Sequence, residues 1–230
     1  MKKVAFCRPG GSYTSDWVGC WTDLMFYCAQ QGIAVIDRPA VFHNIHMVRD
    51  QCLDVNLGRA GQKPFNGNLD YDYIMWIDSD QIWDNRDFQA LLDADEDIVS
   101  GWYALNGTSG QGVCTGWYDE PTLLEKDGMP CMTKREIATA EVTEKGLIDL
   151  AAVHPEYGHP WTGMGFMLIK KGVLESIPYP WFYSEECIKI GNIIGNRGDD
   201  ISFCKKAHEA GYKIYLHPKV RVGHQKLHIW

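Results

Sequence analysis

The chain has no apolar run long enough to span a membrane, and it has no repeat, low-complexity segment or linker. The basic residues at its start precede too short an apolar stretch for a signal peptide, so we expect a strand there. The eight cysteines stand singly, without Cys-x-x-Cys or zinc-finger spacing. The net charge of -8 argues against a nonspecific nucleic-acid binder, which normally carries a basic stripe. These absences favour a protein of the reducing cytoplasm with no transmembrane segment and no nucleic-acid partner.

The 230 residues fit one domain, and short apolar runs alternate with amphipathic stretches through the first half. This alternation predicts an α/β protein with a largely parallel sheet. We expect strands at 4–7, 33–36, 73–77, 98–104, 166–169 and 213–216, and helices at 14–31, 44–56, 84–92, 171–177 and 199–210.

An acidic triplet follows the most apolar of these runs. Tyr73–Ile77 has no polar face and reads as a buried strand, and Asp78 and Asp80 come directly after it. Ligands of open α/β sheets bind where the strands end, and two carboxylates there can share a divalent cation that holds a diphosphate. Three other Asp-x-Asp triplets, at 70–72, 93–95 and 95–97, precede a strand or lie in a loop, where solvation explains them.

A second acidic pair opens a helix at Asp199 and Asp200. Acidic residues favour helix N-termini, so one carboxylate suits a capping role while the other can project into a cleft as a general base. His224 follows a glycine after the last extended segment, which favours it over His217 and His228 as a ligand. Two aspartates, an imidazole and diphosphate oxygens suit Mn²⁺, and Mg²⁺ less specifically.

In order and spacing these motifs resemble the GT-A glycosyltransferases, in particular small family-2-like enzymes of bacteria and viruses. The segment 77–80 resembles their DxD element, 98–103 the following "divaGxY" strand, 162–169 the turn and strand that face the acceptor, and 198–204 the "GEDxxFC" helix start. The resemblance implies a GT-A, Rossmann-like α/β/α sandwich with a mostly parallel, mixed central sheet. It also implies a nucleotide-sugar-binding half at 1–104 and an acceptor-binding, catalytic half at 105–230.

The resemblance implies a hexosyltransferase-type enzyme that moves a sugar from a nucleotide-diphosphate sugar to an acceptor hydroxyl. Asp80 would bind the metal directly, Asp78 would contact ribose or the metal through water, and His224 would be the late metal ligand. Asp200 aligns with the base of inverting relatives, and Asp199 stands where they carry glutamate, so both are catalytic candidates.

The resemblance also suggests residues for the donor, with a UDP-sugar expected first. Arg8 and Pro9 occupy the turn that usually faces the nucleotide, and Ser79 lies inside the DxD motif. Asp37 is placed to accept from a uracil imide, and Arg49 stands where relatives carry an arginine near the base and phosphate.

For the acceptor, a carbohydrate or another hydroxyl compound, the candidates are Trp161 and Gly163. Trp161 follows Pro160 beside the acceptor-like turn, so we expect it on a loop edge where it can stack on a sugar ring. The irregular region 105–160 is expected to set the choice of acceptor.

Two other functions fit parts of the pattern. A sugar nucleotidyltransferase needs a Gly- and Lys-rich phosphate loop, and the turn 8–12 supplies glycines without a following lysine. A noncatalytic nucleotide-sugar or carbohydrate-binding module would be favoured by loss of either acidic motif, and both motifs are intact.

Overall fold

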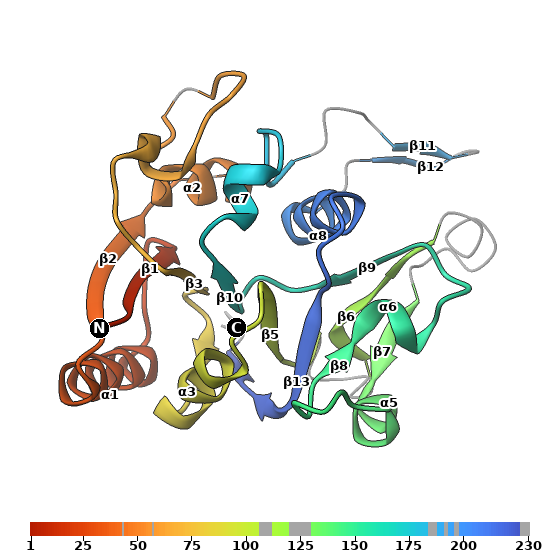
Figure 1. Ribbon diagram of the computed structural model, residues 1–230, viewed down its shortest axis with the longest axis horizontal. Coiled ribbons are helices and arrows are strands. Elements are labelled where there is room, and N and C mark those ends of the chain that lie inside the picture. Colours follow the sequence, from red (N-terminus) through yellow and green to blue (C-terminus); the bar gives the residue numbers. More distant parts are fainter. Residues whose placement is uncertain are drawn as a thin grey trace, which may run out of the picture.

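The computed structural model describes residues 1–42, 44–56, 58–105, 112–119, 130–183, 188–190, 193–195 and 198–225. Its centre is a seven-stranded sheet with the order β2-β1-β3-β10-β5-β13-β8 (Figure 1). The strands are β1 (Lys3–Pro9), β2 (Ala34–Ala40), β3 (Tyr73–Ile77), β5 (Ile98–Trp102), β8 (Ile148–Asp149), β10 (Phe166–Lys170) and β13 (Tyr215–Arg221). β10 is antiparallel to β3 and β5, β8 is antiparallel to β13, and the remaining pairs are parallel. The expected α/β class with a mostly parallel, mixed sheet is therefore confirmed.

Helices cover both faces of this sheet. In Figure 1, α1 and α3 lie on one side, and α2, α7 and α8 lie on the other. The helices are α1 (Ser15–Gln31), α2 (Ile45–Cys52), α3 (Asn85–Ala94), α5 (Lys134–Thr139), α6 (Leu150–Val153), α7 (Val173–Ser176) and α8 (Asp199–Glu209), with a 3-10 turn η1 (Pro64–Gly67).

The burial of β3 shows how the sequence produces these layers. All five of its residues are buried, because alternate side chains of a strand point to opposite faces and both faces are covered. Tyr73, Met75 and Ile77 join the hydrophobic core beside α1 and α3. Ile74 and Trp76 join the core beside α2, α7 and α8.

Helix ends follow local chemistry. The Thr14 hydroxyl accepts from the Trp17 N–H at 3.2 Å to begin α1, and Gly32 ends it in the left-handed region at φ 66°. The expected helix at 44–56 ends early, as α2, at Cys52. The chain turns there, and Asp54 has a left-handed φ of 61°.

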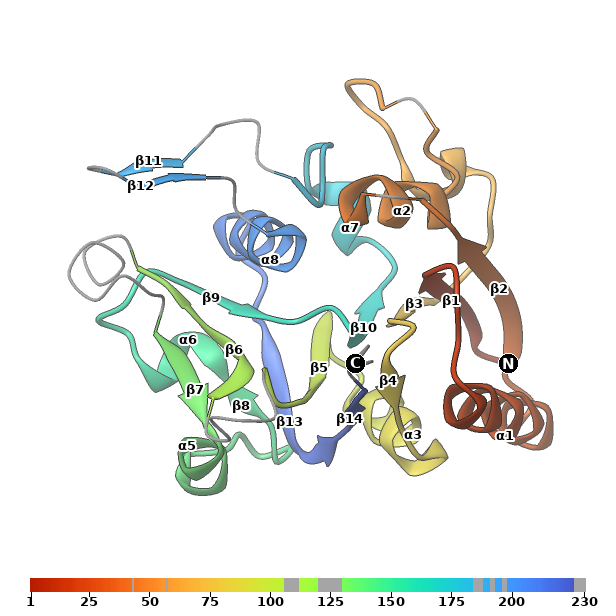
Figure 2. The ribbon, with the colours of Figure 1, turned by 180° about the vertical axis from the view of Figure 1, so that it is seen from behind.

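Smaller sheets lie beside the central one. An antiparallel sheet has the order β7-β6-β9, from β6 (Gly112–Tyr118), β7 (Cys131–Thr133) and β9 (His159–Thr162). Two-stranded sheets join β11 (Ile188–Ile190) to β12 (Ile193–Gly195), and β4 (Gln81–Ile82) to β14 (Gly223–His224), which Figure 2 shows side by side.

Strands from 1–104 and 105–230 are interleaved in the central sheet, because β10 lies between β3 and β5. The functional division at residue 104 stays a prediction. Among the residues with a described position, no helix is long and apolar enough to cross a membrane.

Candidate functional site

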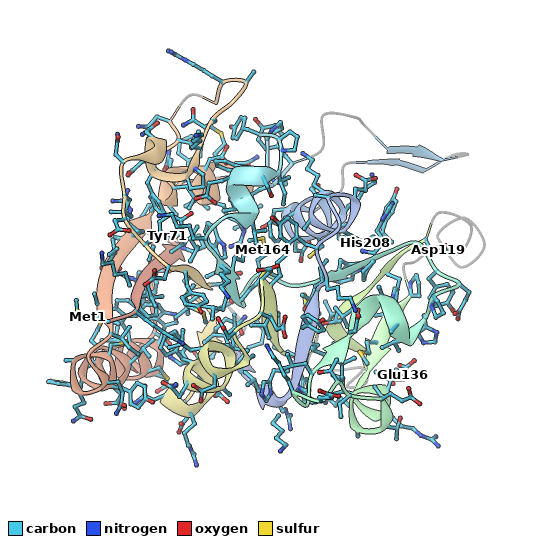
Figure 3. The ribbon with its side chains drawn as sticks, in the orientation of Figure 1. Met1, Tyr71, Asp119, Glu136, Met164 and His208 are labelled. Carbon is cyan, nitrogen blue, oxygen red and sulfur yellow. The ribbon has the colours of Figure 1, made fainter. Side chains whose placement is uncertain are left out.

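The Asp78–Asp80 loop lies between β3 and β4 and is held from three directions. The Asp78 N–H donates to the Gly165 carbonyl oxygen at 3.0 Å, and Trp17 Nε1 donates to the Asp78 carbonyl oxygen at 3.0 Å. The N–H of Gln225 donates to the Asp80 carbonyl oxygen at 2.7 Å. The loop backbone is therefore fixed by the residue directly before β10, by α1 and by the segment after β14. Figure 3 shows Met164, which precedes Gly165, near the middle of the molecule.

The structure brings Asp80 and His224 together, and their binding of a metal stays a prediction. His224 Nε2 lies 3.0 Å from Asp80 Oδ2, and the pairing of β14 with β4 brings the two residues together. His224 Nδ1 lies 2.9 Å from the Ala104 carbonyl oxygen, which can only accept, so Nδ1 carries the proton. In the neutral ring Nε2 then has its lone pair toward the carboxylate. A metal cation can bind both the Nε2 lone pair and the Asp80 carboxylate oxygen. The hydrogen bond from Nδ1 to a backbone carbonyl is the kind that orients metal-binding histidines.

Asp78 has a different environment, because Arg49 pairs with it. Arg49 Nη1 lies 3.2 Å from Asp78 Oδ1, and Arg49 also forms an ion pair with Asp199. The guanidinium is 3% exposed and its carbon lies 5.2 Å from the centroid of the Trp76 ring. Burial raises the pKa of Asp78, against the pull of Arg49. Within the described part of the chain, no group of three His, Cys, Asp or Glu residues is arranged to hold a metal. Protein ligands would thus come from Asp80 and His224.

The two aspartates at the start of α8 have pKa values shifted in opposite directions by their surroundings. Burial alone would raise the pKa of Asp199, but the charge and hydrogen bond of Arg49 lower it. Burial and the charge of Asp199 raise the pKa of Asp200 to about 7, although the Ile201 N–H donates to Asp200 Oδ1 at 2.8 Å. Only Asp200 of this pair can therefore gain and lose a proton near neutral pH.

Arg8 and Asp37, both expected to face the nucleotide, bind each other. Arg8 Nε and Nη2 donate to the two carboxylate oxygens of Asp37 at 2.7 and 2.6 Å. The Arg8 guanidinium carbon lies 4.4 Å from the centroid of the Trp21 ring. Asp37 lies inside β2 and not at its end, because β2 continues to Ala40. Contact of either residue with a nucleotide stays a prediction.

The turn after β1 touches the acidic loop. Arg8 and Pro9 do not lie in a turn as expected, because β1 continues to Pro9, and the turn begins at Gly10, which has a φ of 145°. A Cβ at Gly10 would lie 2.6 Å from the Cβ of Ser79, so glycine lets the turn approach the loop. Pro9 and Ser79 therefore lie in one region, at the C-terminal ends of β1 and β3.

The expectation that Trp161 lies on a loop edge is wrong. Trp161 is in β9, opposite Gly116 of β6, and is 4% exposed, because β9 pairs with β6 and also packs against α8. Gly163 follows β9, and its N–H donates to the Cys114 carbonyl oxygen at 2.8 Å. A Cβ there would lie 2.1 Å from the Tyr103 hydroxyl oxygen, so Gly163 has a packing role, whereas acceptor binding by either residue stays a prediction.

Two residues that support the site, Tyr103 and Trp17, are not among those predicted from the sequence. The Tyr103 ring lies 5.0 Å from the His224 ring between centroids, and its hydroxyl accepts from the Gly165 N–H at 3.2 Å. Trp17 holds the Asp78 carbonyl group as described above. Tyr103 is the last residue of the "divaGxY"-like segment 98–103, which could have drawn attention to it, whereas no sequence signal distinguishes Trp17 from an ordinary core residue.

No protein-family model matches the chain, and no curated protein matches its sequence.

Proposed function

We propose that this protein is a metal-dependent glycosyltransferase that moves a sugar from a nucleotide-diphosphate sugar to an acceptor hydroxyl. We further propose that its fold is of the GT-A type and that its donor is a UDP-sugar. The acceptor is a carbohydrate or another hydroxyl compound, and the site of action is the cytoplasm.

The observation that carries the proposal is the contrast between Asp199 and Asp200. Paired titratable groups with opposed environments are typical of acid–base sites. Arg49 holds Asp199 ionised, whereas Asp200 has a pKa of about 7 and, among the residues that the structure describes, no basic side chain as a hydrogen-bond partner. A base of this pKa can take the proton of an acceptor hydroxyl as its oxygen attacks the anomeric carbon, and the nucleoside diphosphate leaves. Attack from the face opposite the leaving group would invert the anomeric centre.

The pair formed by Asp80 and His224 supports a cation on the donor side. Their oxygen and nitrogen ligands fit Mn²⁺, and Mg²⁺ less specifically, with diphosphate oxygens and water completing the shell. When bound, the cation would neutralise the negative charge of the departing diphosphate. Arg49 keeps Asp78 in place beside this pair, so Asp78 would serve the donor through ribose or a water.

Calorimetric titration of UDP, with and without Mn²⁺, tests the donor site. We expect binding that requires Mn²⁺ and that Asp80→Ala removes. Asp93→Ala is the matched control, because Asp93 begins another Asp-x-Asp triplet on α3 and accepts from Gln89 at 2.6 Å. UDP binding that depends on neither Mn²⁺ nor Asp80 would overturn the proposal that the Asp78–Asp80 motif binds a metal. Metal-dependent UDP binding without turnover of any donor would favour a noncatalytic module.

A further inference from the structure

Gln225 connects the segment that carries His224 to the first turn of α1. The Thr14 hydroxyl donates to Gln225 Oε1 at 2.6 Å, and Gln225 Nε2 donates to Asp16 Oδ2 at 2.9 Å. The Thr14 oxygen also accepts from the Trp17 N–H, so its single proton is directed to the glutamine. The acceptor and donor ends of one amide are thus both used, and its orientation is fixed.

The backbone of the same residue reaches the acidic loop. The Gln225 N–H donates to the Asp80 carbonyl oxygen at 2.7 Å, immediately after His224 pairs with Gln81 across β14 and β4. The same turn of α1 also holds the other end of the loop, because Trp17 Nε1 donates to the Asp78 carbonyl oxygen. A displacement of Gln225 would therefore move Asp80 and His224 relative to each other.

We propose that Gln225 is a positioning residue that sets the separation of Asp80 and His224 for the cation. The inference rests on the proposed function and extends it to a residue that touches neither metal nor donor. Outer residues that orient metal ligands typically contribute roughly 10- to 100-fold to metal affinity. Glutamine suits this place because one end must accept from a hydroxyl while the other donates to a carboxylate.

The test compares Gln225→Ala and Gln225→Glu with the wild type. The apparent affinity for Mn²⁺ is measured by calorimetry at fixed UDP, and kcat is measured at saturating Mn²⁺ with a turned-over donor. We expect both variants to bind Mn²⁺ roughly tenfold more weakly, with kcat at saturating Mn²⁺ close to that of the wild type. The glutamate keeps the contact with Thr14 but places a carboxylate against Asp16, so it should not rescue the affinity.

Gln89→Ala is the matched control. Gln89 also uses both ends of its amide, accepting from the Tyr27 hydroxyl in the C-terminal half of α1 at 2.8 Å and donating to Asp93 of its own helix α3 at 2.6 Å. This variant should keep the wild-type affinity for Mn²⁺. The change in its melting temperature measures how much stability is lost when an amide that bridges two side chains is removed.

The outcomes separate the two proposals. If the wild type itself shows no Mn²⁺-dependent UDP binding, the metal-dependent donor site is overturned, and the positioning role falls with it. If the wild type binds UDP with Mn²⁺ and the folded Gln225 variants keep the wild-type affinity for Mn²⁺, the positioning role alone is overturned. It is also overturned if Gln89→Ala lowers kcat and the Mn²⁺ affinity as much as the Gln225 variants do.

Discussion

Arg49 and Asp199 stand 150 positions apart in the sequence and form a buried ion pair between α2 and α8. The same guanidinium reaches Asp78, so one cation serves the acidic residues of two separate motifs. Burial, and after it the charge of the Asp199 carboxylate that Arg49 keeps ionised, raise the pKa of the neighbouring Asp200, although the charge of Arg49 itself lowers it. The opposite pKa shifts of the two aspartates, which the sequence leaves open, thus follow from burial and from the position of Arg49.

Replacement of Arg49 should be costly, because it leaves two carboxylates without their cation. We expect Arg49→Met to lower the free energy of unfolding by roughly 3–5 kcal/mol, measured by urea denaturation. Arg86→Met is the control, since Arg86 is an exposed cation that pairs with Asp84, and a change within about 0.5 kcal/mol is expected. Adding Asp199→Asn to Arg49→Met should recover part of the loss. Additive effects in this double variant would contradict the coupling.

The pH dependence of transfer should report Asp200. A base must be deprotonated, so kcat/KM should rise as the pH increases through about 7 and then level off. Asp200→Asn should lower kcat by roughly 10²–10⁴-fold and remove this rise, because its amide cannot take a proton. A profile of the same shape in the variant would show that another group titrates.

The same raised pKa should make the protein less stable at higher pH. Between the ordinary carboxyl pKa of 3.8 and about 7, folded Asp200 keeps a proton that the unfolded chain releases. The free energy of unfolding therefore falls as the pH rises through this window. We expect Asp200→Asn to melt higher than the wild type at pH 8, by roughly 2–4 °C for each kcal/mol recovered, and to match it near pH 4. Asp93→Asn on the exposed side of α3 should match the wild type at both values.

Gly163 should not tolerate even one methyl group. Its Cβ would lie 2.1 Å from the Tyr103 hydroxyl oxygen and 2.6 Å from Cys114 Sγ. We expect Gly163→Ala to lower the free energy of unfolding by about 1–3 kcal/mol, with partial recovery on adding Tyr103→Phe. Gly19→Ala is the contrast, because Gly19 lies within α1 with no atom near its Cβ position, and alanine should stabilise that helix by about 0.5–1 kcal/mol. Equal effects of the two substitutions would contradict the packing argument.

Much of the fold could be predicted from local pattern. The run Tyr73–Ile77 is a strand at its predicted bounds, because five consecutive apolar residues need cover on both faces. Helix α1 begins at its predicted cap and ends at Gly32, because side-chain capping and the left-handed conformation are local properties.

Features that depend on distant partners could not be predicted in this way. Pro160 suggested a loop edge for Trp161, but β9 pairs with β6 and packs against α8, and no pattern near residue 161 reveals these partners. The sequence likewise marked Arg8 and Asp37 as two separate nucleotide contacts, whereas β1 and β2 lie side by side and let them bind each other. Candidate residues were thus found by type and position, and their partners required the structure.

The most direct test measures nucleoside diphosphate release from a panel of nucleotide sugars, with UDP-sugars first, by the wild type and Asp200→Asn. We predict Mn²⁺-dependent release by the wild type that Asp200→Asn nearly abolishes, although the variant still binds UDP and Mn²⁺. Release by Asp200→Asn at the wild-type rate, or no release from any donor by a wild type that binds UDP, would contradict glycosyl transfer with Asp200 as its base.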